Sequence, residues 1–188
     1  MLSLLLGSGM AVAADFDKGL KAYSSGDIET ALAEFTPLAE QGHALAQYNL
    51  GVIYKYGKGV QVSNKAAIKW YTKSAAQGYA AAQHNLGAIY THGEGVRKNH
   101  KTAFYWYRLA AGQGDARAQY NLGRNYYFGH GVLTDYVRAY MWSNLSAYNG
   151  YNSKIDNRVI ISKKMTSADI SKAQEMSSRC LESGYTDC

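Results

Sequence analysis

The chain has 188 residues, of which 47% are hydrophobic and 18% charged, with a single proline. This composition excludes intrinsic disorder, collagen and a highly charged tail, and the length fits one compact domain or one short array of repeated units. The formal net charge of +6 is spread along the chain. It favours mild attraction to anionic surfaces and does not indicate nucleic-acid binding, which needs a basic stripe interleaved with aromatic side chains.

Residues 1–14 have the pattern of a cleaved export signal. An apolar run from Leu2 to Leu6 is followed by small residues that end at Ala14 and suit a signal peptidase. Because no Lys or Arg precedes the apolar run, a short N-terminal helix of a cytosolic protein is the alternative. No other stretch has the apolar length of a membrane span. We therefore expect a periplasmic or secreted protein without a transmembrane helix.

The segment 15–43 predicts a helix pair that is shorter than the units after it. Residues 26–27, Gly-Asp, occupy the place that a long loop takes further along the chain. Ala31, Phe35 and Ala39 then recur on one face of a predicted second helix.

From Ala44 the sequence repeats with a period of 36 residues. The stretch AQYNLGVIYKYGKGV, which begins at Ala46, returns as AQHNLGAIYTHGEGV at Ala82 and as AQYNLGRNYYFGHGV at Ala118. A fixed period in this range indicates a solenoid, in which each unit buries its apolar side against its neighbours. The apolar spacing after Ala46 predicts one helix that ends near Tyr56.

A Gly-x-Gly-Val loop follows this first helix, and a second helix follows the loop. Glycine ends the first helix because it reaches a positive φ without a Cβ clash. The column before the second helix holds residues that cap helix N-termini, namely Ser63, Asn99 and Asp135. A glycine within each first helix predicts close approach of a Trp or Tyr. The strict spacing of the tryptophans assigns them to the core between helices: Trp70, Trp106 and Trp142.

The last part of the chain, 152–188, predicts two helices, near Ser153 to Lys164 and Ser167 to Ser183, that cover the open end of the array. Its two cysteines are Cys180 and Cys188. In an exported protein they would form a disulfide that holds the tail on the last helix. In a cytosolic protein they would be free thiols.

These columns together resemble the Sel1-like repeat, a longer-looped relative of the tetratricopeptide repeat. The shared pattern is A-x-Q-x-x-L-G-x-x-Y-x-x-G-x-G-V, followed by A-x-x-W-Y and A-x-x-G. Asn125 and Ser143 depart from it in the third copy. The resemblance implies an all-α, right-handed superhelix of helix-turn-helix repeats with a C-terminal capping helix pair, which holds other proteins together. The expected segments are a signal peptide (1–14), a tetratricopeptide-like unit (15–43), three Sel1-like repeats (44–79, 80–115 and 116–151) and the capping helices with the tail (152–188).

Positions that vary between the repeats while facing one way are candidates for partner binding, because the constant positions are used for packing. In related superhelices the first helices line the concave side, where aromatic and basic residues would bind a protein or an extended peptide of the bacterial envelope. Half-buried tyrosines that only cover a helix surface are the alternative interpretation. We call the candidate positions the concave stripe: Tyr48, Val52, Lys55, Tyr56, His84, Ala88, Thr91, His92, Tyr120, Arg124, Tyr127 and Phe128.

We expect no catalytic site, metal site or cofactor. His84 and His92 would lie more than about 10 Å apart on one helix, and the Gly-x-Gly pairs follow helices instead of the strands that precede nucleotide-binding loops. The expected function is therefore that of an exported interaction scaffold. A cell-wall glycan-binding module is the alternative. A β-lactamase-like hydrolase is disfavoured, because this chain lacks the paired cysteines that such relatives carry inside each repeat. The sequence leaves the partner and the oligomeric state open.

Overall fold

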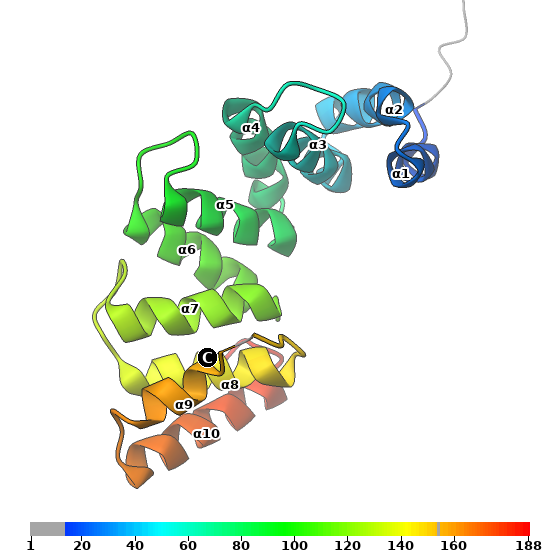
Figure 1. Ribbon diagram of the computed structural model, residues 1–188. Coiled ribbons are helices and arrows are strands. Elements are labelled where there is room, and N and C mark those ends of the chain that lie inside the picture. The colour runs from blue at the N-terminus through cyan, green and yellow to red at the C-terminus, as the bar shows by residue number, and fades with distance from the viewer. Residues whose placement is uncertain (1–13, 154) are drawn as a thin grey trace, which may run out of the picture.

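The computed structural model describes residues 14–153 and 155–188, and these residues form ten α-helices and no strand. The predicted export signal lies outside the described residues, apart from Ala14. Consecutive helices pack as pairs, and the pairs stack in chain order into a curved array (Figure 1). The helices are α1 (Phe16–Ser25), α2 (Ile28–Glu40), α3 (Ala44–Tyr56), α4 (Asn64–Ala76), α5 (Ala80–His92), α6 (His100–Ala111), α7 (Ala116–Phe128), α8 (Tyr136–Tyr148), α9 (Asn157–Ser162) and α10 (Ser167–Glu182).

The apolar core is divided along the array, as a solenoid requires. One buried cluster joins α1 and α2 to α3, a second joins α4 to α5, and a third joins α6, α7, α8 and α10. Trp70 and Trp142 are buried as predicted, whereas Trp106 is only partly buried. The predicted all-α solenoid is therefore confirmed, with one of its three tryptophans at the edge of the core.

The mid-helix glycines allow close packing of the two helices in a pair. A Cβ atom on Gly87 would lie 2.6 Å from the ring of Tyr107, and one on Gly51 would lie 2.6 Å from the ring of Tyr71. The predicted close approach is thus made by tyrosine. In the third repeat Ser143 replaces the ring, and its hydroxyl donates to the carbonyl of its own helix at Ala139.

The second glycine of each Gly-x-Gly loop lies in close contact with the preceding unit of the array. At Gly95, where φ is 74°, a Cβ atom would lie 2.4 Å from the Cβ of Asn64, the first residue of α4. Both the backbone conformation and the lack of space therefore require glycine. The equivalent contacts join Gly59 to Ile28 and Gly131 to His100.

A buried glutamine in each first helix connects three consecutive helices. Gln83 of α5 donates from Nε2 to the carbonyl of Ala75 at the end of α4 (3.2 Å), and its Oε1 accepts from Gln113, just after α6 (2.8 Å). Both ends of the buried amide are satisfied, so its burial is not penalised. The same arrangement recurs for Gln47, with Ala39 and Gln77, and for Gln119, with Ala111 and Asn149. We call this row of amides the glutamine ladder.

Replacing Gln83 by methionine should lower the free energy of unfolding by about 1 to 3 kcal/mol, because it removes the two side-chain hydrogen bonds that connect α5 to Ala75 and to Gln113. Urea denaturation followed by circular dichroism measures this loss. The matched control is Gln174→Met, at an exposed position of α10. Equal stability of the two variants would contradict a structural role for the ladder.

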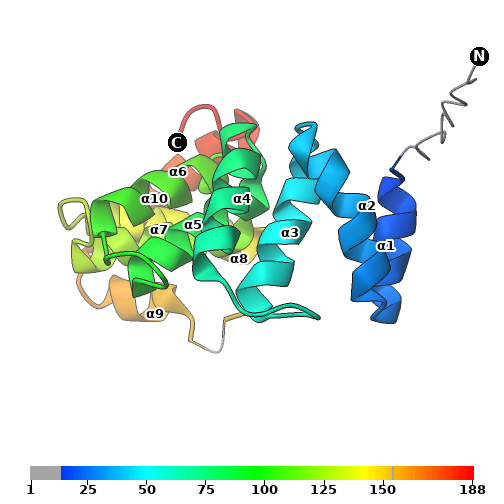
Figure 2. The same cartoon turned by 90° about the horizontal axis from the view of Figure 1, so that it is seen from above.

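Two helices follow the third repeat, and both pack on α8. α10 covers the open end of the core with Ala173, Ser177 and Cys180. α9 begins at Asn157, later than the sequence predicted, and lies along the opposite edge of the array from α10 (Figure 2). The two capping helices therefore cover α8 from different sides.

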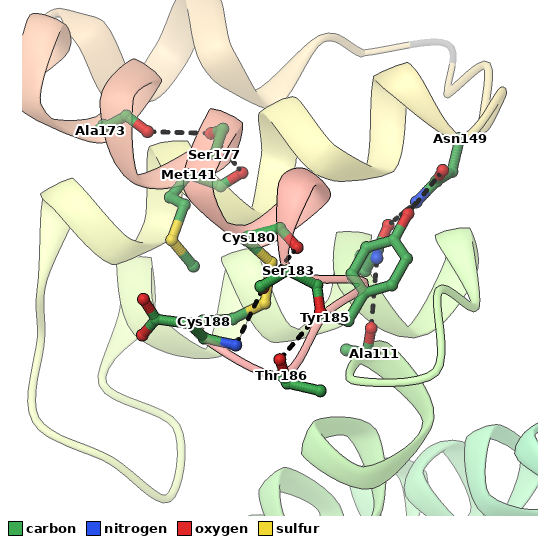
Figure 3. The surroundings of a disulfide bond; sticks show 12 residues. Ala111, Met141, Asn149, Ala173, Ser177, Cys180, Ser183, Tyr185, Thr186 and Cys188 are labelled. Carbon is green, nitrogen blue, oxygen red and sulfur yellow. Dashed lines mark hydrogen bonds between the residues drawn. A yellow bond between two sulfur atoms is a disulfide. The ribbon is translucent and has the colours of Figure 1, made fainter.

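The predicted disulfide between Cys180 and Cys188 is formed, and it closes a loop at the end of the chain (Figure 3). Within this loop Tyr185 has a positive φ of 69° and its backbone N–H donates to the carbonyl of Cys180. The phenol oxygen of Tyr185 lies 2.7 Å from Nδ2 and 2.9 Å from Oδ1 of Asn149. Because Asn149 also donates to Gln119, the loop extends the glutamine ladder to the end of the fold.

Replacing Cys188 by serine should lower the free energy of unfolding by about 2.5 kcal/mol, as expected for opening a short closed loop. Thermal unfolding with and without a thiol reductant measures the effect. The reductant should destabilise the unsubstituted chain and leave Cys188→Ser unchanged. An unchanged melting temperature of the unsubstituted chain in the presence of the reductant would contradict a stabilising role for the disulfide.

Candidate functional site

The concave stripe lies on α3, α5 and α7, the first helices of the three repeats. In Figure 1, α1 and α3 lie nearer the inside of the curve than α2 and α4. α5 also contacts α7 directly, as expected for helices on the inner side of a curved array. The helices that carry the stripe therefore lie toward the inner side of the array, and the stripe residues differ in how far they are exposed.

One column of the stripe packs against aromatic rings of its own repeat. The ring of Tyr48 lies 5.0 Å from that of Tyr79, and the imidazole of His84 lies 5.8 Å from the ring of Tyr107 (centroid distances). Tyr120 contacts Tyr151 at 5.0 Å and accepts a hydrogen bond from Ser153. These three side chains are half-buried, so only their edges are available to a partner.

The four stripe residues Val52, Ala88, Thr91 and Tyr127 are also partly buried. Val52 packs on the cluster that joins α4 to α5. The Thr91 hydroxyl donates to the carbonyl of Gly87 at 2.8 Å, so its proton is used in a hydrogen bond within its own helix.

The two predicted cations of the stripe have different surroundings. Lys55 forms an ion pair with Glu94, at 3.1 Å, and its side chain is only 15% exposed. This pair connects α3 to the loop after α5, and the sequence period gave no signal for it because the two partners belong to different columns. Arg124 is exposed and forms no ion pair within residues 14–153 and 155–188. The available positive charge of the stripe is therefore concentrated on α7.

The most exposed part of the stripe is a row of three rings, one at the last residue of each first helix. Tyr56 is 63% exposed, Phe128 is 53% exposed, and His92 is exposed as well. We call these three residues the ring row. None of them belongs to a buried core cluster, although the Phe128 ring also contacts those of Tyr127 and His130.

A cavity of about 280 Å³ lies between α7 and α9. The sequence predicted α9 only as a capping helix, and its contribution to this cavity was not predicted. The signal that pointed to it is the apolar run Val159 to Ile161, of which only Ile161 is buried. We call the cavity the α7–α9 pocket; it is lined by Tyr120, Arg124, Tyr127, Phe128, Ile155, Asn157, Ile160 and Ile161.

Among the described residues, no group of three or more His, Cys, Asp or Glu side chains could hold a metal ion. None of the helices in that part of the chain is both long and apolar enough to cross a membrane. The arrangement thus offers exposed rings, one unpaired cation and an apolar pocket, which are features of a binding surface.

The comparisons with known proteins agree with this architecture. The family model for the Sel1 repeat matches residues 44–79, 80–115 and 116–151. The chain belongs to the Sel1 repeat family. Sel1 repeats typically form scaffolds without catalysis. A search of curated proteins finds no similar sequence.

Two solved structures resemble this Sel1 repeat protein. A Sel1 repeat protein from Oxalobacter formigenes is 37% identical, with a TM-score of 0.63, over 69% of this chain and 97% of that one. The c5321 protein, a protective antigen present in uropathogenic Escherichia coli strains, displays the same fold with 30% identity and a TM-score of 0.53. That match covers 89% of this chain and 44% of the antigen, so this chain spans less than half of its length.

The stability of the fold should fall in acid because of His84. Burial, with a smaller contribution from the nearby Arg117 guanidinium, lowers the pKa of His84 below its usual value of 6.5. The unfolded chain therefore takes up a proton as the pH falls through about 6.5 while the folded chain does not, and folding stability is lost progressively below that pH.

Replacing His84 by asparagine should reduce the slope of unfolding free energy against pH between about pH 7 and about pH 5. Urea denaturation at a series of pH values measures it. The matched control is His92→Asn, at the exposed end of the same helix, which should change the slope less. A larger change in the control would show that the buried imidazole is not the cause.

Proposed function

We propose that this Sel1 repeat protein is an extracytoplasmic scaffold that binds a partner protein or peptide along its concave stripe and catalyses no reaction. The ring row is the observation that supports this most directly. These rings are exposed at equivalent positions of every repeat and lie outside the buried core, and such rings often dominate the energetics of protein interfaces.

Two features favour a location outside the cytoplasm. The disulfide between Cys180 and Cys188 fits an oxidising compartment, since cytosolic thiols are usually kept reduced. Residues 1–14 carry the small and apolar pattern of an export signal. The likeness to an antigen of uropathogenic Escherichia coli agrees with such a location.

The glycan-binding alternative has no specific observation in its favour. Carbohydrate platforms need flat rings that face the ligand side by side, whereas Tyr48, Tyr120 and Tyr127 of the stripe pack at an angle against other rings. Tyr48 meets Tyr79 at 66°, and Tyr127 meets Tyr136 at 54°. These rings are therefore arranged for contact with one another.

The test replaces the ring row by serine, as Tyr56→Ser, His92→Ser and Phe128→Ser in one variant. A partner is first captured from the envelope fraction with the unsubstituted chain, identified by mass spectrometry and purified. Titration of the purified partner should then show an affinity at least about 30-fold weaker for the variant, because hot-spot rings contribute about 2 kcal/mol or more. The melting temperature should stay unchanged.

The matched control places serine at two exposed aromatic residues on second helices, Tyr105 of α6 (48% exposed) and Tyr148 of α8 (72% exposed). This variant should bind the partner like the unsubstituted chain. Equal binding by the ring-row variant and the control would contradict the proposed surface.

A further inference from the structure

The α7–α9 pocket combines apolar walls with one polar group that has no partner. Ile155, Ile160 and Phe128 line it and remain exposed, although side chains of this kind are usually covered. The amide nitrogen Nδ2 of Asn157 is buried and has no hydrogen-bond partner among the described residues.

The charge at the pocket is positive and unopposed. Arg124 lines the pocket with its guanidinium 5.8 Å from the ring centre of Phe128, and it forms no ion pair within the described parts of the chain. The nearby acidic residue Asp156 is already neutralised, because its two carboxylate oxygens accept from Nε and Nη2 of Arg158 at 3.0 and 2.7 Å. The Asp156 carboxylate therefore does not oppose a negative ligand at Arg124.

The size of the pocket suits one large side chain. A cavity of about 150 Å³ admits a benzene ring, and this pocket has about 280 Å³. Four of its lining residues, Tyr120, Arg124, Tyr127 and Phe128, also belong to the concave stripe. The pocket is thus continuous with the proposed binding surface, and α9 forms its far wall.

We propose that the α7–α9 pocket binds a bulky apolar side chain of the partner that has an acidic residue next to it in an extended segment. The apolar side chain lies against Ile155, Ile160 and Phe128, while the carboxylate accepts hydrogen bonds from the exposed Arg124 guanidinium. Charge-assisted hydrogen bonds of this type are stronger than neutral ones. This inference rests on the proposed function, because it names the chemistry of the partner at one end of the same surface.

The test uses three synthetic peptides with blocked termini, so that any carboxylate belongs to a side chain. Each carries a central pair, Leu-Asp, Leu-Asn or Ala-Asp, in a Gly-Ser segment. Titration followed by NMR of the ¹⁵N-labelled protein measures the affinity and locates the site. We expect the Leu-Asp peptide to bind at least tenfold more tightly than either of the others and to shift the amide signals of Ile155, Asn157 and Ile160.

Two variants separate the two parts of the pocket. Arg124→Gln should abolish the preference for Leu-Asp over Leu-Asn, and Ile160→Ser should abolish the preference for Leu-Asp over Ala-Asp. The matched control is Arg97→Gln, an exposed arginine outside the pocket, which should keep both preferences. Equal affinity for the Leu-Asp and Leu-Asn peptides, or a preference that survives Arg124→Gln, would overturn the proposal.

Binding of the purified partner to the ring-row variant and to the two pocket variants distinguishes the pocket proposal from the proposed function. If the purified partner is lost from the ring-row variant but still binds Arg124→Gln and Ile160→Ser with full affinity, the scaffold function stands and the pocket proposal is wrong. Self-association that disappears in Ile160→Ser, measured by sedimentation velocity, would place a second copy of the chain in the pocket and would also overturn it.

Discussion

Each repeat is held to the next by a buried glutamine side chain that makes hydrogen bonds in two directions. Gln83 bonds to the end of the preceding second helix and to the residue after its own repeat's second helix. Since the amide is buried, it has to find both partners, and only one placement of neighbouring repeats provides them. The apolar contacts between repeats supply the larger share of the burial, but they are less directional. The ladder therefore fixes the register in which the pairs stack.

This register explains how the ends of the array are built. The ladder has no further glutamine after the third repeat, and Tyr185 ends the row by bonding to the side chain of Asn149. Tyr185 reaches that position because the disulfide and the αL backbone fold the tail back onto α10. The tail thus extends the polar row that connects the repeats. The disulfide therefore positions Tyr185 in addition to closing a loop.

The packing also decides which variable residues are free to bind. Lys55 and His84 vary between repeats, as a binding residue would, yet each is used to join one repeat to another. The rings at the ends of α3, α5 and α7 remain exposed, since they lie at the last residue of each first helix and outside the buried core clusters. Position along the helix, more than variability, separates the exposed residues of the stripe from those that pack.

The sequence by itself determined the repeat, the helix pairs, their caps and the glycines that end the first helices, because these depend on local spacing and on backbone conformation. It also indicated the disulfide. Only the tertiary structure decided that Lys55 is neutralised by Glu94. It alone placed α9 beside α7 to form a pocket with Arg124 and an unpartnered Asn157. These contacts join residues of different columns or of the unrepeated tail, so no period in the sequence records them, and they arise only when the chain is packed.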